Sequence, residues 1–124
     1  WSRGLGDVYK RQLLGDRDVA RNGMGNQFFG HRASLPIGAA LLAIDTGRPL
    51  FTCATSYDGD TLVITFDNEV VFDRSPVTGR DRLRRAQEVT ALLVANFERH
   101  IAEHPQNWHQ LQPVWPDLIA SEKK

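Results

Sequence analysis

Residues 13–50 read LLGDRDVARNGMGNQFFGHRASLPIGAALLAIDTGRPL. The two leucines at positions 13–14 are typical of the end of a buried strand, and residues 15–18 are predicted to form the turn that follows it. Residues 19–27 are polar and contain the pairs Asn-Gly and Gly-Asn, which predict a loop. This part of the sequence is therefore expected to place a charged turn at the end of a strand.

The remainder of that segment predicts a short helix. Residues 28–30, Phe-Phe-Gly, form a short apolar anchor ahead of it. Pro36 is expected at the first helical position, with Ser34 as the N-terminal cap. Alanine and leucine then recur at helical spacing through residues 37–45, and Gly47 ends the helix because glycine readily adopts the left-handed conformation needed there.

The centre of the chain predicts a β-meander of about three strands. Residues 49–56 form an apolar run typical of a buried strand, and the Asp-Gly-Asp sequence at residues 58–60 predicts a hairpin turn. The partner strand is expected over residues 61–66, and a third strand over residues 70–72.

A long C-terminal amphipathic helix is predicted over residues 80–103, ending before Pro105. Its apolar side chains recur every three or four residues, at Leu83, Ala86, Val89, Leu93, Phe97 and Ile101. Residues 106–118 combine tryptophans with two prolines and are too apolar for a free tail. Trp108 and Trp115 are therefore expected to dock over the core or at a lipid interface.

The composition limits the classes of function. The chain has 124 residues, of which 41% are hydrophobic, and its 15 basic residues balance its 15 acidic ones. This balance favours neither nucleic acid nor a strongly anionic surface as a partner. The apolar runs are shorter than the roughly 18 residues of a membrane span. The single Cys53 excludes an internal disulfide and is expected to be a buried thiol in a reducing compartment.

One structural unit is expected at residues 13–118. Residues 1–12, WSRGLGDVYKRQ, begin with tryptophan rather than methionine and have neither helical nor strand periodicity. They are expected to be a non-native or artefactual segment, with a flexible basic arm as the alternative. Residues 119–124 are expected to fray.

The turn Asp16-Arg17-Asp18 is the first candidate for chemistry. Sheets of α/β proteins place ligand-binding groups at the carboxyl ends of their strands. A carboxylate there can orient an imidazole and stabilise its charge, and an arginine can bind a phosphate or a second carboxylate. The alternative is a solvated turn in which Asp18 accepts hydrogen bonds from nearby backbone amides.

The aromatic pair Phe28-Phe29 and the helix start at Gly38 form the second candidate. The phenyl rings suit the wall of an acyl groove, with core packing under a loop as the alternative. Free amides at the helix start near Gly38 suit a phosphate or thioester oxygen. Arg32 suits an anionic headgroup or the phosphates of coenzyme A, and is otherwise a surface arginine.

The histidines argue against a metal site. His100 and His104 lie one helical turn apart, but the residues between them do not follow the order of His-Glu-x-x-His zinc proteases. Cys53 is remote, and Pro105 breaks the helix directly after the second histidine. No metal is therefore expected.

The order of these motifs resembles the second half of the bacterial lysophospholipid-type acyltransferases, and most closely their phosphatidylinositol mannoside acyltransferase branch. The resemblance covers residues 13–118 and rests on Asp-Arg-Asp, Phe-Phe-Gly, Pro-x-Gly, Thr-Gly-x-Pro-Leu and a terminal His-Pro-x-x-Trp, in that order. It implies an α/β fold, the C-terminal portion of the three-layer acyltransferase fold. The family's catalytic histidine lies in a His-x-x-x-x-Asp motif that this sequence lacks. The chain is therefore expected to be a fragment, and inactive alone.

The resemblance also implies a reaction and roles for particular residues. Asp16 occupies the position of the acidic residue that pairs with the catalytic histidine. The residues expected to contact substrate are Arg17, Asp18, Phe28, Phe29, Arg32 and Gly38. The reaction moves a fatty acyl group from acyl-coenzyme A to a hydroxyl of a mannosylated phosphatidylinositol, with no metal or other cofactor. The enzyme is expected to be peripheral, at the cytoplasmic face of the plasma membrane, with no nucleic-acid partner.

Two alternatives stay open. A late lipid A acyltransferase would use acyl carrier protein as its donor, although the ending at residues 106–115 fits the mannoside branch better. A small non-catalytic α+β binding module would be complete as it stands. Such a module would melt cooperatively and reversibly, whereas a truncated sheet with a bare strand edge would aggregate.

Overall fold

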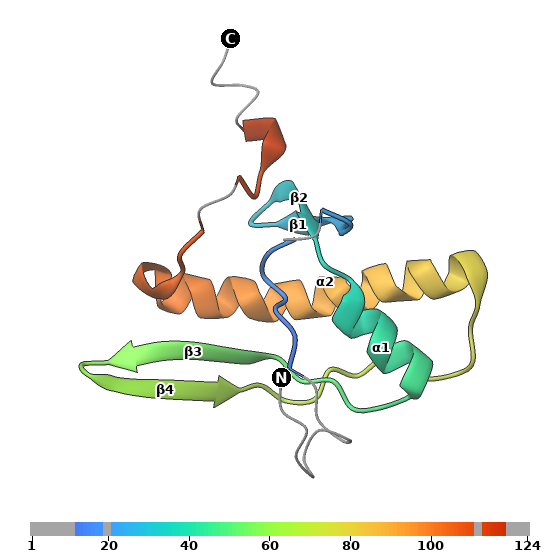
Figure 1. The fold of residues 1–124 in the computed structure, drawn as a ribbon, viewed down its shortest axis with the longest axis horizontal. Coiled ribbons are helices and arrows are strands. Elements are labelled where there is room, and N and C mark those ends of the chain that lie inside the picture. The colour runs from blue at the N-terminus through green and yellow to red at the C-terminus, as the bar shows by residue number, and fades with distance from the viewer. Residues whose placement is uncertain (1–11, 19–20, 111–112, 119–124) are drawn as a thin grey trace.

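The computed structural model describes residues 12–18, 21–110 and 113–118. Its longest element is α2 (Gly79–Glu103), which runs through the middle of the molecule with a hairpin on either side (Figure 1). The shorter α1 (Gly38–Thr46) packs across α2. None of the described helices is both long and apolar enough to cross a bilayer.

The strands form two separate antiparallel hairpins. β1 (Met24–Phe28) pairs with β2 (His31–Leu35) on one side of α2, and β3 (Cys53–Asp58) pairs with β4 (Thr61–Phe66) on the other (Figure 1). In each hairpin, the residues of the two strands pair one to one along their whole length. The described residues thus mix α and β structure, as predicted, but contain no parallel strand pair.

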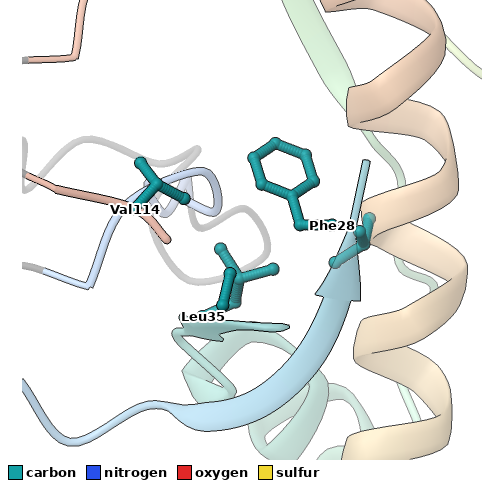
Figure 2. Close-up of a cluster of buried hydrophobic side chains, with 5 residues drawn as sticks. Phe28, Leu35 and Val114 are labelled. Atoms are coloured by element: carbon teal, nitrogen blue, oxygen red, sulfur yellow. The ribbon is translucent and has the colours of Figure 1, made fainter. Parts of the chain in front are cut away.

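One face of α2 carries two buried clusters. The cluster near the start of the helix, against α1, consists of Ala40, Val70, Ala86, Val89 and Leu93. The cluster near its end, against β1 and β2, consists of Phe28, Ala33, Leu35, Val94 and Val114. Figure 2 shows Val114 facing Phe28 and Leu35. The segment after α2 therefore folds back onto the first hairpin, and the second cluster depends on it.

The sequence predicts both helices, but it places the start of α1 at Pro36, two residues before the observed start at Gly38. α2 begins one residue before the predicted start and ends before Pro105, where the 3-10 turn η1 (Pro105–Asn107) follows. Gly47 has a φ of 65° and its N–H donates to the carbonyl of Ala43, so it ends α1 as predicted. The predicted cap is wrong, because Ser34 lies within β2 and its hydroxyl binds an aspartate instead.

The first hairpin replaces much of the loop predicted over residues 19–27. Phe29 and Gly30 form its turn with φ values of 50° and 76°, the left-handed conformations of a type I′ turn. Ala33 and Leu35 point into the core from alternate positions of β2. The polar composition of β1 concealed this strand, since only its last residue, Phe28, is fully buried.

The strand predicted to end at Leu13 and Leu14 is not observed. These side chains are 50% and 71% exposed, and neither residue lies in a strand. Within the described residues no strand lies beside them to supply a ladder of hydrogen bonds. The prediction of a buried strand before the Asp-Arg-Asp turn is therefore wrong for this structure.

Of the predicted three-strand meander, only the first two strands are observed, as β3 and β4. β3 begins at Cys53 rather than at residue 49, and residues 70–72 form no strand. The amide of Val70 donates to the carbonyl of Leu50 at 2.8 Å, so this segment only prolongs the hairpin irregularly. Val70 is buried against both helices, whereas Val71 is 84% exposed.

The second hairpin presents an apolar face to solvent. Tyr57, Leu62, Ile64 and Phe66 share this face and are 51% to 71% exposed. A sheet covered by helices on both faces does not occur among the described residues. The predicted mixture of α and β structure is therefore confirmed, whereas the three-layer arrangement is not.

Candidate active site

Residues 16–18, the charged turn, line a pocket together with residues that follow α2. Asp16, Arg17 and Asp18 lie around a cavity of about 320 Å³. The other residues that line it are Arg21, Ser34, Gln110, Pro113, Val114 and Pro116. The pocket thus combines carboxylates and guanidinium groups within a volume that suits a small polar group. The first three residues are those that the sequence predicted as a site, and they line the same pocket.

Asp16 and Arg17 are tied to the segment after α2. Oδ2 of Asp16 accepts a hydrogen bond from the indole Nε1 of Trp108 at 3.0 Å. The neighbouring Arg17 donates from Nη2 to the carbonyl of His109 at 2.9 Å. Asp16 and Arg17 therefore occupy fixed positions even though they lie outside any helix or strand.

Arg17 also approaches the carboxylate beside it. Its Nε lies 3.7 Å from Oδ1 of Asp16, close enough for attraction of charges but too far for a hydrogen bond. This Nε is buried and has no hydrogen-bond partner among the described residues. Nε is thus an unused donor beside the pocket.

Asp18 closes a local loop. Its Oδ1 accepts from the amide of Asn22 at 3.1 Å, and its Oδ2 accepts from the amide of Gly23 and the hydroxyl of Ser34 at 2.9 and 2.8 Å. Partial burial alone would raise the pKa of Asp18, but the bonds from Ser34, Gly23 and Asn22 outweigh it and lower the pKa. The predicted alternative, a turn aspartate binding backbone amides, is observed here.

The lowered pKa of Asp18 gives a pH dependence of stability. A carboxyl whose pKa is lower in the folded state stabilises the fold above its unfolded pKa of 3.8, and this contribution is lost as pH falls through the folded pKa. Asp18→Asn is expected to cost about 1 kcal/mol at pH 7, limited by solvent screening, and much less near pH 2. Urea unfolding at both pH values checks this, and equal costs would contradict it.

Gly23 lets two backbone segments meet. A Cβ at this position would lie 2.4 Å from the carbonyl oxygen of Leu35 and 2.8 Å from Oδ2 of Asp18. At Gly25 a Cβ would meet only the flexible end of Arg32, at 3.3 Å from Nε. Close approach of backbone to backbone therefore requires glycine at the first position and not at the second.

Alanine at these two positions is expected to have unequal effects. Gly23→Ala should lower the free energy of unfolding by about 2–3 kcal/mol, because the backbone of β2 must shift. Gly25→Ala, the matched control, should change it by less than about 0.5 kcal/mol. Denaturant midpoints measure both, and similar midpoints for the two variants would refute the close contact at Gly23.

An aromatic cluster adjoins the pocket. The ring of Phe28 lies 5.8 Å from those of Trp108 and Trp115, edge-on to the first and stacked with the second. Phe28 is fully buried, so it takes the core-packing role and does not line an open groove. Phe29, at the turn, is 38% exposed and lies 6.4 Å from the ring of Trp115. The predicted docking of both tryptophans over the core is confirmed.

Two predicted site residues lie apart from the pocket. Arg32 is exposed on β2 opposite Gln27, and the end of its side chain reaches Gly25 of β1. Gly38 is the exposed first residue of α1, with open space where a Cβ would be. Neither residue lines the pocket formed around Asp16.

A histidine–aspartate pair occurs elsewhere. Nε2 of His100 lies 2.8 Å from Oδ2 of Asp67, and both side chains are 13% exposed. Arg99 binds the other oxygen of Asp67, so the pair ties α2 to the end of β4. It does not border the pocket. Within the described ranges, no group of three or more histidine, cysteine or acidic side chains could hold a metal ion.

Sequence reasoning missed Arg21, which lines the pocket, and the roles of Ser34 and Trp108. Ser34 was predicted to cap a helix, and it instead donates to Asp18 from β2. Trp108 was predicted to dock, but its hydrogen bond to Asp16 was not foreseen. The apolar tail with its tryptophans was the available signal, because a buried indole usually requires an acceptor for its N–H.

Comparison with known proteins identifies the family. The family described as bacterial lipid A biosynthesis acyltransferase matches residues 10–116. The phosphatidylinositol mannoside acyltransferase of Mycolicibacterium smegmatis is 32% identical to this chain over 112 residues, which are 90% of this chain and 34% of that relative. The protein of the same name from Mycobacterium tuberculosis H37Rv is also 32% identical over 112 residues, which are 90% of this chain and 33% of that relative.

This chain thus spans about a third of the length of the curated relatives that it matches. The family match runs through both hairpins, both helices and the tail that lines the pocket. This chain belongs to the bacterial lipid A biosynthesis acyltransferase family.

Proposed function

We propose that this chain is the C-terminal part of an acyltransferase that moves a fatty acyl group from acyl-coenzyme A to a hydroxyl of a mannosylated phosphatidylinositol. The observation that carries the proposal is the 32% identity, over 90% of the chain, to phosphatidylinositol mannoside acyltransferases. The geometry of the Asp16 pocket supports it, because the pocket offers a carboxylate with a fixed orientation.

In the proposed reaction the acceptor hydroxyl attacks the thioester carbonyl. A histidine on the part of the enzyme outside this chain removes the hydroxyl proton, and coenzyme A leaves as the thiol after receiving that proton. The role of Asp16 is to orient the imidazole and to stabilise its positive charge while it holds the proton. Without that histidine, Asp16 has no proton acceptor to assist, so the chain alone is inactive.

The substrate-binding roles divide between the pocket and the surface around it. Arg17 and Arg21 line the pocket and are suited to phosphate oxygens of the donor or of the lipid headgroup. Arg32 and Gly38 lie outside it, and we propose that they contact more distant parts of the substrates. Asp18 keeps a supporting role, because its oxygens already accept three hydrogen bonds. No metal or other cofactor is required.

We propose a peripheral location at the cytoplasmic face of the plasma membrane. The acceptor is a membrane lipid and acyl-coenzyme A is a water-soluble donor, so the active site must lie near the bilayer surface. Phe29 is exposed at a hairpin turn beside Trp115, and aromatic rings of this kind are favourable at a lipid interface. Phe28 is buried and packs beneath this surface instead of being exposed on it.

A product assay tests the proposal. The longer polypeptide, meaning the full-length acyltransferase of which this chain is the proposed C-terminal part, is incubated with radiolabelled palmitoyl-coenzyme A and mannosylated phosphatidylinositol. The lipids are then separated and identified by mass spectrometry. We expect an acylated mannolipid from the longer polypeptide and none from the 124-residue chain. Turnover by the 124-residue chain, or none by the longer one with any donor, would contradict the proposal.

The same assay separates the alternatives. A late lipid A acyltransferase is the second candidate, favoured by the description of the matching family. It would use acyl carrier protein and a lipid A precursor in place of the two substrates above. A non-catalytic binding module would give no product with either donor, and the 124-residue chain would unfold in one cooperative, reversible transition.

A further inference from the structure

We propose that Trp108 is a positioning residue for Asp16. Its indole N–H holds Oδ2 of the carboxylate, at 3.0 Å, and leaves Oδ1 for the catalytic imidazole. The inference rests on the proposed function, since it requires Asp16 to act on a histidine. A hydrogen bond to one carboxylate oxygen restricts both rotatable bonds of an aspartate side chain.

A second hydrogen bond makes the contact a two-point clasp. Arg17 donates from Nη2 to the carbonyl of His109 at 2.9 Å. Two neighbouring residues of one segment therefore bind two neighbouring residues of the other, across 92 positions of sequence in each case. The clasp thus holds the side chains of two successive residues, in a segment that lies outside any helix or strand.

Trp108 is itself held by the core. Its ring meets Phe28 edge-on, with centroids 5.8 Å apart and an interplanar angle of 87°. It also meets the ring of Trp115, with centroids 6.2 Å apart. Because Phe28 is fully buried, the indole of Trp108 cannot turn away from Asp16 without disturbing the cluster.

The remaining oxygen of Asp16 is suited to a further donor. Its Oδ1 has Nε of Arg17 at 3.7 Å, a separation longer than a hydrogen bond. The carboxylate is 24% exposed and lines the pocket, so a group entering there can reach it. An indole N–H donates only, and so Trp108 does not compete for the proton that the histidine carries.

Loss of the indole N–H is expected to affect catalysis more than substrate binding. In the longer acyltransferase, Trp108→Phe keeps an aromatic ring in the cluster and removes the donor to Asp16. We expect kcat to fall about tenfold, with KM for acyl-coenzyme A changed less than about threefold. The acid limb of the pH profile of kcat/KM should move to lower pH, because a misaligned carboxylate stabilises the imidazolium less.

Trp115→Phe is the matched control. It removes an indole N–H from the same cluster, but one that binds the carbonyl of Phe28 and not Asp16. We expect its kcat within about twofold of wild type and its pH profile unmoved. Equal losses in the two variants, without a pH shift in Trp108→Phe, would show that the aromatic cluster acts only on folding and would overturn the inference.

A double variant isolates the path through Asp16. If Trp108 acts through the carboxylate, Trp108→Phe combined with Asp16→Asn is no slower than Asp16→Asn alone, whereas multiplied losses overturn the inference. Wild-type kcat in Asp16→Asn would refute both the proposed role of Asp16 and this inference. An impaired Asp16→Asn variant together with an unimpaired Trp108→Phe variant leaves the proposed function standing and removes only the inference.

If Trp108→Phe does not accumulate as folded protein, 3-benzothienylalanine at this position keeps the ring shape without an N–H, and the same outcomes apply.

Discussion

Asp16→Asn is expected to lower kcat of the longer acyltransferase roughly 10³-fold, which corresponds to about 4 kcal/mol of transition-state stabilisation. Asparagine has the shape of aspartate, and its oxygen can still accept the bond from Trp108. Its amide group would then face the imidazole as a neutral donor. The histidine would lose the charge that stabilises its protonated form and the acceptor that fixes its tautomer.

Steady-state kinetics with palmitoyl-coenzyme A check this expectation. KM should stay within about threefold of wild type, because the lost interaction forms mainly in the transition state. Asp45→Asn is the control for removal of one negative charge, since Asp45 is an exposed residue that pairs with Arg82 between the two helices. A loss of less than tenfold in Asp16→Asn, or an equal loss in Asp45→Asn, would contradict the assignment of Asp16.

The parts of this fold that the sequence predicts are those with local causes. The apolar side chains of α2 recur at helical spacing, and the helix lies within one residue of its predicted bounds. Gly47 and the Asp-Gly-Asp turn at residues 58–60 each specify a backbone conformation by themselves, and both are observed. In these places local preference and packing agree.

The first hairpin was missed because its turn breaks the usual preference. Type I′ turns favour asparagine or glycine at their first central position, and this turn has Phe29 there with a φ of 50°. Tertiary contacts offset the strain: the amide of Phe29 donates to Oε1 of Glu98 at 2.7 Å, and its ring packs against that of Phe28. A residue on α2 thus stabilises the turn, and no pattern within residues 24–35 reveals it.

The site was predicted from a motif, but its construction was not. Asp16 and Trp108 are separated by 92 positions, and the bond between them follows from how the tail folds over the first hairpin. Composition indicated that the tail docks, because it is rich in tryptophan, but it did not indicate which acceptor its indole would find. Similarly, Ser34 matched a helix cap in sequence, and β2 placed its hydroxyl against Asp18 instead.

Phe28→Ala is expected to lower the free energy of unfolding by about 3–5 kcal/mol, since Phe28 is fully buried. Its ring contacts those of Phe29, Trp108 and Trp115, so alanine leaves a cavity that these large rings cannot all fill. The whole stability of a domain is typically about 5–15 kcal/mol, and at about 4 °C per kcal/mol this loss should lower the melting temperature by about 12–20 °C. Circular dichroism melts provide the measurement.

Phe29→Ala is the matched control for Phe28→Ala, because it removes the same ring from the adjacent, 38% exposed position. It also keeps a Cβ at a residue with positive φ, so backbone strain in the turn is unchanged. We expect a loss below about 1 kcal/mol there. If Phe28→Ala fails to fold, Phe28→Leu should still cost about 1–1.5 kcal/mol. Because Phe28 also holds the ring that binds Asp16, Phe28→Leu should reduce acyl transfer as well as stability. Equal melting temperatures for Phe28→Ala and Phe29→Ala would show that this core does not depend on Phe28.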